Sequence, residues 1–298
     1  METKDTVKTI SDEICTLGEG PIWHGGQGKL YWADIMKSRL WVYDYAAQTN
    51  EVFWEGDFLV GGFAFTKNDD LVLCSNKGVH LLEKEGGYRN PPRPLFDIPL
   101  KESEMFNDIV VDPRGRILAG TLVRGGGLGF LYRLEKGKDP VILLENLKCS
   151  NGMAFSGDTK TFYHTDSGHL SIKRYLYDVE RGEISEPQVF YQGDREAGLP
   201  DGMTMDAEGC IWSAFWGGYA VRRFSPEGEM IREILFPARQ MTSVMFGGPK
   251  MDKLFATSAA SGAHDLSTGF KEDGTFMGGP TYMVSPGVKG VPETPADF

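Results

Sequence analysis

A pattern of two short strands recurs six times along the chain and limits the folds it can adopt. In each copy a loop rich in glycine, proline or polar residues leads into an apolar strand, and a polar turn follows that strand. A second apolar strand comes next, and one apolar residue marks it in each copy: Leu30, Leu71, Ile117, Phe162, Ile211 and Leu254. The markers are 41 to 49 residues apart. This period is typical of a four-stranded propeller blade, so six copies predict a six-bladed β-propeller.

The rest of the sequence favours an all-β fold in one domain. No apolar stripe of helical period extends over more than two turns. A closed propeller leaves no sheet edge exposed, so we expect a strand near residues 7–10 to pair with residues 281–284 and complete the last blade. The sequence thus predicts a single propeller domain over residues 1–298.

The charge balance and the N-terminal sequence restrict the partners and the compartment. The chain has 31 basic and 42 acidic residues, a net charge of −11, and no basic patch interleaved with aromatic residues. We therefore expect neither nucleic acid nor a membrane among the partners. Residues 1–5 lack the apolar core of a signal peptide, and no apolar run approaches the roughly 18 residues of a membrane span. These features predict a soluble, cytoplasmic protein.

One position of the repeat is rich in side chains that carry oxygen. Ten or eleven residues before the markers stand, in chain order, Glu19, Gly61, Asn107, Asn151, Asp201 and Ser243. Residues at one phase of the innermost strands come together around the channel of a propeller. Two carboxylates and two amides would meet there with no Lys or Arg in phase, and the carboxylates would repel each other without a cation. The sequence therefore predicts a cation site built from distant segments.

Four segments, in this order, resemble the signature segments of a known family. They are residues 18–23 (Gly-Glu-Gly-Pro-Ile-Trp), 107–108 (Asn-Asp), 150–154 (Ser-Asn-Gly-Met-Ala) and 200–203 (Pro-Asp-Gly-Met). The family is the senescence marker protein-30/gluconolactonase (SMP-30/gluconolactonase/LRE-like) family, and the resemblance extends over essentially the whole chain. It implies a six-bladed propeller with one divalent cation in its channel and hydrolysis of sugar lactones.

The resemblance also implies roles for individual residues. Glu19, Asn151 and Asp201 would ligate the metal, and Asn107 would contact the substrate or a water molecule on the metal. One substrate-binding position departs from the family pattern. Sugar lactonases of the family often carry an Arg two residues before the equivalent of Asn107, and this chain has Met105 there. A thioether in place of a multi-donor cation should weaken recognition of a polyhydroxylated ring such as gluconolactone.

The predicted chemistry follows from the ligand types. Acid and amide oxygens suit a hard cation, so Ca²⁺ is the first candidate, with Mg²⁺, Mn²⁺ and Zn²⁺ as alternatives. Such a cation would polarise the carbonyl of a sugar lactone or related hydroxy-acid lactone, while a carboxylate takes a proton from the attacking water. The resemblance assigns the catalytic base to Asp201. Metal ligation lowers the pKa of a carboxylate, so Asp201 would mainly position water or take the proton of an already acidified water.

Two other functions remain open on sequence alone. A similar cation in a similar propeller could polarise a phosphoryl oxygen, which would make a phosphotriesterase-like hydrolase. A non-catalytic recognition propeller is the third hypothesis, because residues 30–34 (Leu-Tyr-Trp-Ala-Asp) are similar to the repeat of extracellular receptor propellers. That string occurs only once, however, and a propeller that only binds does not need carboxylates in its channel. Residues 124–129 (Arg-Gly-Gly-Gly-Leu-Gly) would form either a flexible hairpin or a mobile lid over the channel mouth.

Overall fold

Strands make up nearly all the regular secondary structure of the chain. A computed structural model describes residues 6–298. Residues 1–5, where the sequence predicts no signal peptide, lie outside the described residues. Within 6–298, 24 strands form six four-stranded sheets, and the only helical turns are two 3-10 turns, η1 (Ile35–Lys37) and η2 (Ser167–His169). The six four-stranded sheets confirm the predicted all-β fold of a six-bladed propeller.

The chain divides into two compact units of three sheets each. The first unit contains the described residues up to Glu55 together with Gly193–Pro292. The second unit contains Gly56–Gln192 together with Glu293–Phe298. Each unit therefore combines segments that are far apart in the sequence.

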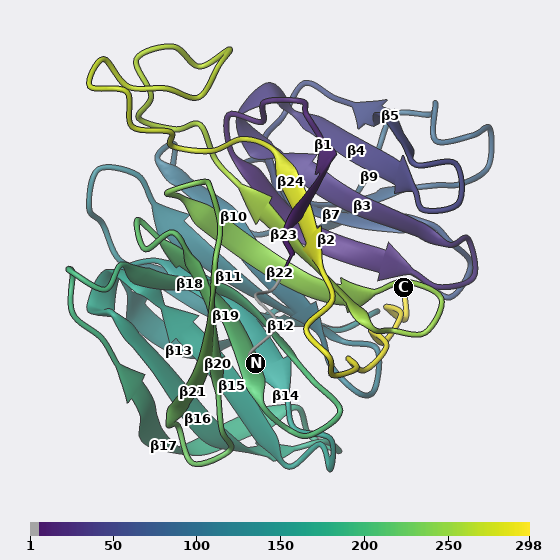
Figure 1. The fold of residues 1–298 in the computed structure, drawn as a ribbon. Coiled ribbons are helices and arrows are strands. Elements are labelled where there is room, and N and C mark those ends of the chain that lie inside the picture. The colour runs from purple at the N-terminus through teal and green to yellow at the C-terminus, as the bar shows by residue number, and fades with distance from the viewer. Residues whose placement is uncertain (1–5) are drawn as a thin grey trace. The chain divides into compact units, whose positions relative to one another are not determined.

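The first unit has three antiparallel sheets (Figure 1). One has the order β2-β3-β4-β5, with the bounds Gly18–His24, Lys29–Asp34, Arg39–Asp44 and Thr49–Glu55. Another has the order β18-β19-β20-β21, with the bounds Leu199–Met205, Ile211–Trp216, Ala220–Phe224 and Met230–Leu235. The third has the order β1-β24-β23-β22, with the bounds Lys8–Ser11, Thr281–Val284, Lys253–Ser258 and Met241–Gly247. In this sheet β1 pairs with β24, so strands from both ends of the chain lie side by side.

The second unit also has three antiparallel sheets, and their strands follow the chain order. The first consists of β6 to β9, with the bounds Val60–Phe65, Leu71–Ser75, Gly78–Leu82 and Arg93–Phe96. The next consists of β10 to β13, with the bounds Glu104–Val111, Ile117–Val123, Gly129–Leu134 and Val141–Leu147. The last consists of β14 to β17, with the bounds Ser150–Phe155, Thr161–Asp166, Ser171–Asp178 and Glu183–Gln192.

The second strand of each repeat forms the centre of the core. The six marker residues lie in β3, β7, β11, β15, β19 and β23, and none of them is more than 1% exposed. These strands are apolar on both faces because both faces are covered; β7 (Leu71–Ser75), for example, is buried at every position. The buried apolar residues that mark the repeat therefore also hold each sheet in its unit.

The turns between first and second strands follow a local sequence rule. In the β10–β11 turn, Oδ1 of Asp112 accepts the backbone N–H groups of Arg114 and Arg116, at 2.8 and 2.9 Å. In the β18–β19 turn, Oδ1 of Asp206 accepts two N–H groups in the same way. A glycine at positive φ follows each aspartate three residues later, which is a conformation that glycine adopts without strain. These two acidic glycine turns thus fix the geometry of the β10–β11 and β18–β19 hairpins.

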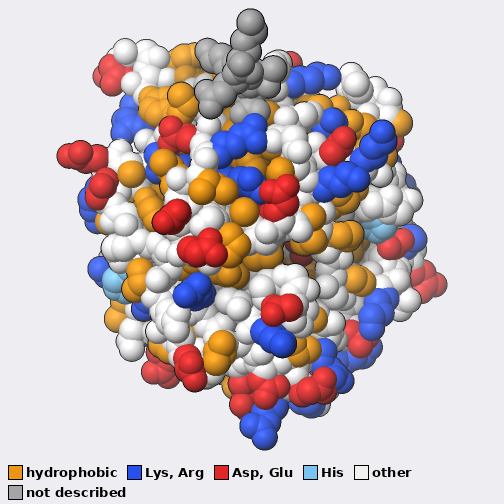
Figure 2. Space-filling view, turned by 60° about the horizontal axis from the view of Figure 1, so that its bottom comes forward, with side chains coloured by type: hydrophobic (Ala, Val, Ile, Leu, Met, Phe, Trp, Pro, Cys, Tyr) orange, Lys and Arg blue, Asp and Glu red, His pale blue; other side chains and the backbone are white. Residues whose placement is uncertain are grey.

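The surface carries mixed charge. On the face shown in Figure 2, Lys and Arg side chains are interspersed with Asp and Glu, and apolar side chains lie between them. No helix in residues 6–298 is long and apolar enough to cross a membrane.

Candidate functional site

The pairing between first and second strands is interrupted at the same place in all six sheets. In β10, Asn107 and Asp108 lie opposite the single residue Gly120, because the register shifts between Phe106 and Ile109. Corresponding shifts lie between Glu19 and Ile22, Val60 and Gly62, Ser150 and Met153, Pro200 and Met203, and Met241 and Val244. All six positions of the oxygen-rich phase lie at or directly beside these bulges. Bulges redirect side chains and often occur beside active sites. The backbone geometry therefore marks these six positions as candidates for a functional site.

Two of the predicted site residues are in direct contact in the second unit. Nδ2 of Asn107 donates hydrogen bonds to the backbone oxygen of Ser150 and to Oδ1 of Asn151, at 2.8 and 2.7 Å. Nδ2 of Asn151 donates to Oγ of Ser167 at 2.9 Å. Both side chains are buried, at 8% and 6% exposure. Because each Nδ2 is engaged as a donor, the orientation of both amides is fixed and so is the place of each Oδ1.

A buried aspartate anchors the loop before Asn151, and a second aspartate repeats the arrangement before Glu19. Asp166, at the end of β15, accepts the N–H groups of the two residues that precede Ser150, at 3.1 and 3.0 Å. Asp34, at the end of β3, accepts the N–H groups of the two residues that precede Gly18, both at 3.1 Å. A 3-10 turn follows each aspartate. The spacing of the repeat does not predict these positioning residues, although an Asp at the end of the second strand in two repeats is a visible signal.

The two predicted carboxylates lie in the first unit. Glu19 on β2 and Asp201 on β18 are buried, at 8% and 5% exposure. Strand β22 packs against both β2 and β18. Oγ1 of Thr242 on β22 donates to the backbone oxygen of Gly18 at 2.6 Å. The residue after Asp201, Gly202, lies so close to Ser243 that an added Cβ would be 2.1 Å from the Ser243 Oγ. Glu19 and Asp201 thus flank Thr242 and Ser243.

The donor chemistry of the predicted ligands fits a hard cation. Glu19 and Asp201 offer carboxylate oxygens, and the oriented Oδ1 of Asn151 has a second lone pair beyond the one used by Asn107. No group of three or more His, Cys, Asp or Glu side chains in the described range 6–298 is placed to hold a metal ion. The predicted set contains only two residues of these types, so its third ligand has to be an amide. That these three residues ligate one cation stays a prediction.

Two neighbours of Asn107 on β10 have distinct environments. Met105, the departure from the family pattern, is 3% exposed and lies two residues before Asn107. Asp108 follows Asn107 in the bulge, and burial raises the pKa of its carboxyl to about 6, although the N–H of Ile109 lowers it. A carboxylate with this pKa is in the range of a general base at neutral pH. The spacing of the repeat singles out Asn107 and predicts no role for Asp108.

A buried histidine supports the segment that carries Asn151. Nε2 of His164 on β15 lies 2.8 Å from Oγ of Ser150, and both residues are buried. Burial lowers the pKa of His164 to about 4; Asp166 raises it and Lys173 lowers it further. The imidazole is therefore neutral at pH 7 and pairs with the hydroxyl as a neutral group.

The low pKa of His164 predicts a pH dependence of stability. Between pH 6.5 and 4 the unfolded chain binds a proton at this histidine and the folded protein does not, so stability falls as the pH falls. From pH 7 to pH 5, wild type should lose about 2 kcal/mol more free energy of unfolding than His164→Gln does. Urea unfolding at both pH values measures this difference, with the exposed His264→Gln as the matched control. Equal losses of free energy of unfolding in all three proteins would contradict the low pKa of His164.

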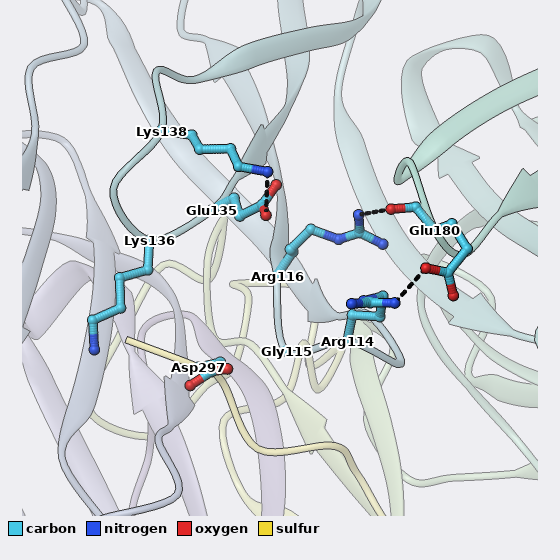
Figure 3. Close-up of a pocket in the computed structure, with 8 residues that line it drawn as sticks. All are labelled: Arg114, Gly115, Arg116, Glu135, Lys136, Lys138, Glu180 and Asp297. Atoms are coloured by element: carbon cyan, nitrogen blue, oxygen red, sulfur yellow. Dashed lines mark hydrogen bonds and ion pairs between the residues drawn. The ribbon is translucent and has the colours of Figure 1, made fainter.

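A polar pocket of about 390 Å³ in the second unit is a separate feature (Figure 3). It is lined by Arg114, Gly115, Arg116, Glu135, Lys136, Lys138, Glu180 and Asp297. Nζ of Lys138 lies 2.7 Å from Glu135, and Arg114 forms an ion pair with Glu180. The pocket contains none of the predicted site residues, and acids of the same chain pair with Arg114, Arg116 and Lys138. We therefore do not assign the candidate site to it.

The chain is similar to a known family and to several named enzymes. The family model described as the SMP-30/Gluconolactonase/LRE-like region matches residues 17–260. Pentonolactonase XacC of Haloferax volcanii is 33% identical over 98% of both chains. The 6-deoxy-6-sulfogluconolactonase of Pseudomonas putida is 34% identical over 86% of this chain and 87% of its own length.

A solved structure shows the same fold over the full length. It is regucalcin of Agrobacterium tumefaciens, described as a calcium-binding protein, which is 26% identical to this chain. The match has a TM-score of 0.91 and covers 99% of this chain and 98% of the other.

Proposed function

Because the chain belongs to the SMP-30/gluconolactonase/LRE-like family, we propose that it is a divalent-cation-dependent lactonase that hydrolyses a sugar lactone or a related hydroxy-acid lactone. One observation carries the proposal beyond the family: the buried amides and carboxylates of the repeat all lie at or directly beside strand bulges. Relatives with similarity over most of the chain are named lactonases, which supports the same reaction class.

The proposed roles follow from the chemistry of each side chain. Glu19, Asn151 and Asp201 would hold the cation, for which Ca²⁺ is the first candidate because all three ligands offer oxygen. A divalent cation at such a site would supply Lewis-acid polarisation of the lactone carbonyl. Asn107, whose Nδ2 is already engaged, would present its Oδ1 to a hydroxyl of the substrate or to the attacking water. Asp201 would orient that water and accept its proton.

The proposal predicts that activity depends on a cation. Protein stripped with a chelator should hydrolyse lactones at least about a hundredfold more slowly than protein with one divalent cation restored, as expected when several kcal/mol of charge stabilisation are lost. Proton release measures this with a panel of aldonolactones and simple aliphatic lactones, adding Ca²⁺, Mg²⁺, Mn²⁺ or Zn²⁺ singly.

Measurements on the same panel of lactones can also contradict the proposal. If no lactone is hydrolysed with any cation, the lactonase assignment fails and phosphotriesters become the next substrates to test. If lactones are hydrolysed equally well with and without chelator, the reaction class stands and the cation requirement is wrong.

A further inference from the structure

An arginine from the Gly-rich hairpin lies against the methionine that departs from the family pattern. Nη2 of Arg124 is 3.4 Å from Sδ of Met105. Met105 is buried, whereas Arg124 is exposed. The guanidinium therefore reaches from the surface to a residue only two positions before Asn107.

The strand register places Arg124 on the same face of the sheet as Asn107. Side chains two residues apart on a strand share a face, so Met105 and Asn107 lie on one face of β10, and Phe106 points to the core on the other. In the ladder with β11, Met105 is opposite Leu122. The backbone N–H of Arg124 donates to the oxygen of Ser103 at 2.8 Å, which continues this ladder by two residues. Residues opposite each other in a ladder share a face, and Arg124 is opposite Ser103. The Arg124 side chain therefore projects from the same face of the sheet as Met105 and Asn107.

The arginine is held at the base of the hairpin and not at its tip. Its N–H bond to Ser103 fixes the Arg124 backbone to β10, and the chain turns only afterwards, at Gly125 and Gly126, which have positive φ of 87° and 95°. At the other end, Gly129 is so close to Thr121 that an added Cβ would lie 2.5 Å from the Thr121 oxygen. The Gly-rich segment thus forms the turn between β11 and β12, and its geometry directs Arg124 back toward β10.

We propose that Arg124 is a specificity-determining residue that binds oxygen substituents of the lactone ring beside Asn107. This inference rests on the proposed lactonase function and names its substrate class: lactones with hydroxyl or carboxylate groups, with carboxylates bound more strongly. A guanidinium presents planar N–H donors that match a carboxylate in two parallel hydrogen bonds. The Met105 sulfur is a weak acceptor, so a substrate oxygen displaces it readily. Arg124 would therefore supply, from the position directly after β11, the cation that position 105 lacks.

Kinetics on three lactones tests the proposal with Arg124→Ala and Arg124→Lys. The probes are γ-valerolactone, which has no polar substituent, glucono-1,5-lactone, which has hydroxyls, and a glucaric acid lactone, which has a carboxylate. In Arg124→Ala we expect KM to rise about 10- to 100-fold for the carboxylate probe and about 2- to 10-fold for the hydroxylated probe, with little change for γ-valerolactone. Arg124→Lys should recover part of the loss for the carboxylate probe only. Leu128→Ala, an exposed change in the same hairpin, is the matched control.

A binding measurement separates this inference from the lactonase proposal. Calorimetric titration of gluconate and glucarate needs no turnover, and Arg124→Ala should weaken glucarate binding more than gluconate binding. If wild type hydrolyses no lactone but this difference in binding appears, the lactonase proposal fails, and what stands is that Arg124 binds the carboxylate of a polyhydroxylated acid. If Arg124→Ala raises KM equally for all three lactones, or changes neither KM nor binding while its melting temperature matches wild type, Arg124 does not recognise the substrate.

Discussion

Replacing Asp201 by alanine is expected to lower kcat for lactone hydrolysis by about 10²- to 10⁴-fold, and saturating divalent cation should not restore it. The proposed role of Asp201 combines metal ligation with orientation of the attacking water, and alanine removes both. If ligation alone were lost, a large excess of cation would recover turnover by mass action. The measurement is proton release on the best lactone of the panel, over a cation titration that reaches a plateau.

Three further variants make this result specific to Asp201. Asp201→Asn keeps the volume of the buried side chain and should lose almost as much activity, which separates the chemical role from packing. Glu208→Gln removes an exposed acid from the turn that follows β18 and should retain wild-type activity. Asp108→Asn tests the other carboxylate suited to a base, because its pKa is raised to about 6. If Asp201→Ala keeps full turnover and Asp108→Asn loses turnover, the catalytic base is Asp108 and not Asp201.

The fold was predictable from the sequence because the residues that define the repeat are apolar and buried. A residue such as Phe162 or Leu254 has one role, to fill the core of its sheet, and the same requirement returns in every copy. The period between such residues therefore reports the length of a blade directly. The turns were predictable for a similar reason, since Asp112 and Asp206 each bond to backbone groups within a few residues.

The parts of the site that the sequence did not predict depend on contacts between distant segments. The bulge at Asn107 exists because β10 and β11 pair out of register, and pairing is not visible in either strand alone. Asp166 anchors a loop 17 residues before it, so its role requires the fold. For residues 124–129 the sequence predicts only a flexible hairpin or a mobile lid, because nothing in it places the Arg124 guanidinium on Met105. Spacing predicts which residues are candidate oxygen ligands, whereas the contacts that hold these residues in place come from tertiary structure.

Gly61 is the one member of the oxygen-rich phase whose side chain carries no oxygen. Its replacement by alanine is expected to destabilise the second unit. A Cβ on Gly61 would lie 2.0 Å from the backbone oxygen of Phe106 and 2.9 Å from Cα of Asn107. Both atoms belong to the main chain of β10, so no side-chain rotation relieves the clash. We expect Gly61→Ala to lower the free energy of unfolding by about 1–3 kcal/mol or more, as overpacking does. Urea unfolding measures this change.

The clash at position 61 should push β10 away from β6 and so displace the Asn107 bulge, because β6 packs directly against β10. Moving β10 by about 1 Å strains the hydrogen bonds from Asn107 to Ser150 and Asn151, and misplacement of a positioning group by this distance costs about a hundredfold in rate. We therefore expect kcat/KM of folded Gly61→Ala to fall by that factor. Gly157→Ala is the matched control, since an added Cβ meets nothing within 4 Å there and its stability and activity should stay at wild-type values. If Gly61→Ala is as stable and active as Gly157→Ala, β10 tolerates the shift, and close packing at Gly61 does not explain why this position has no side chain.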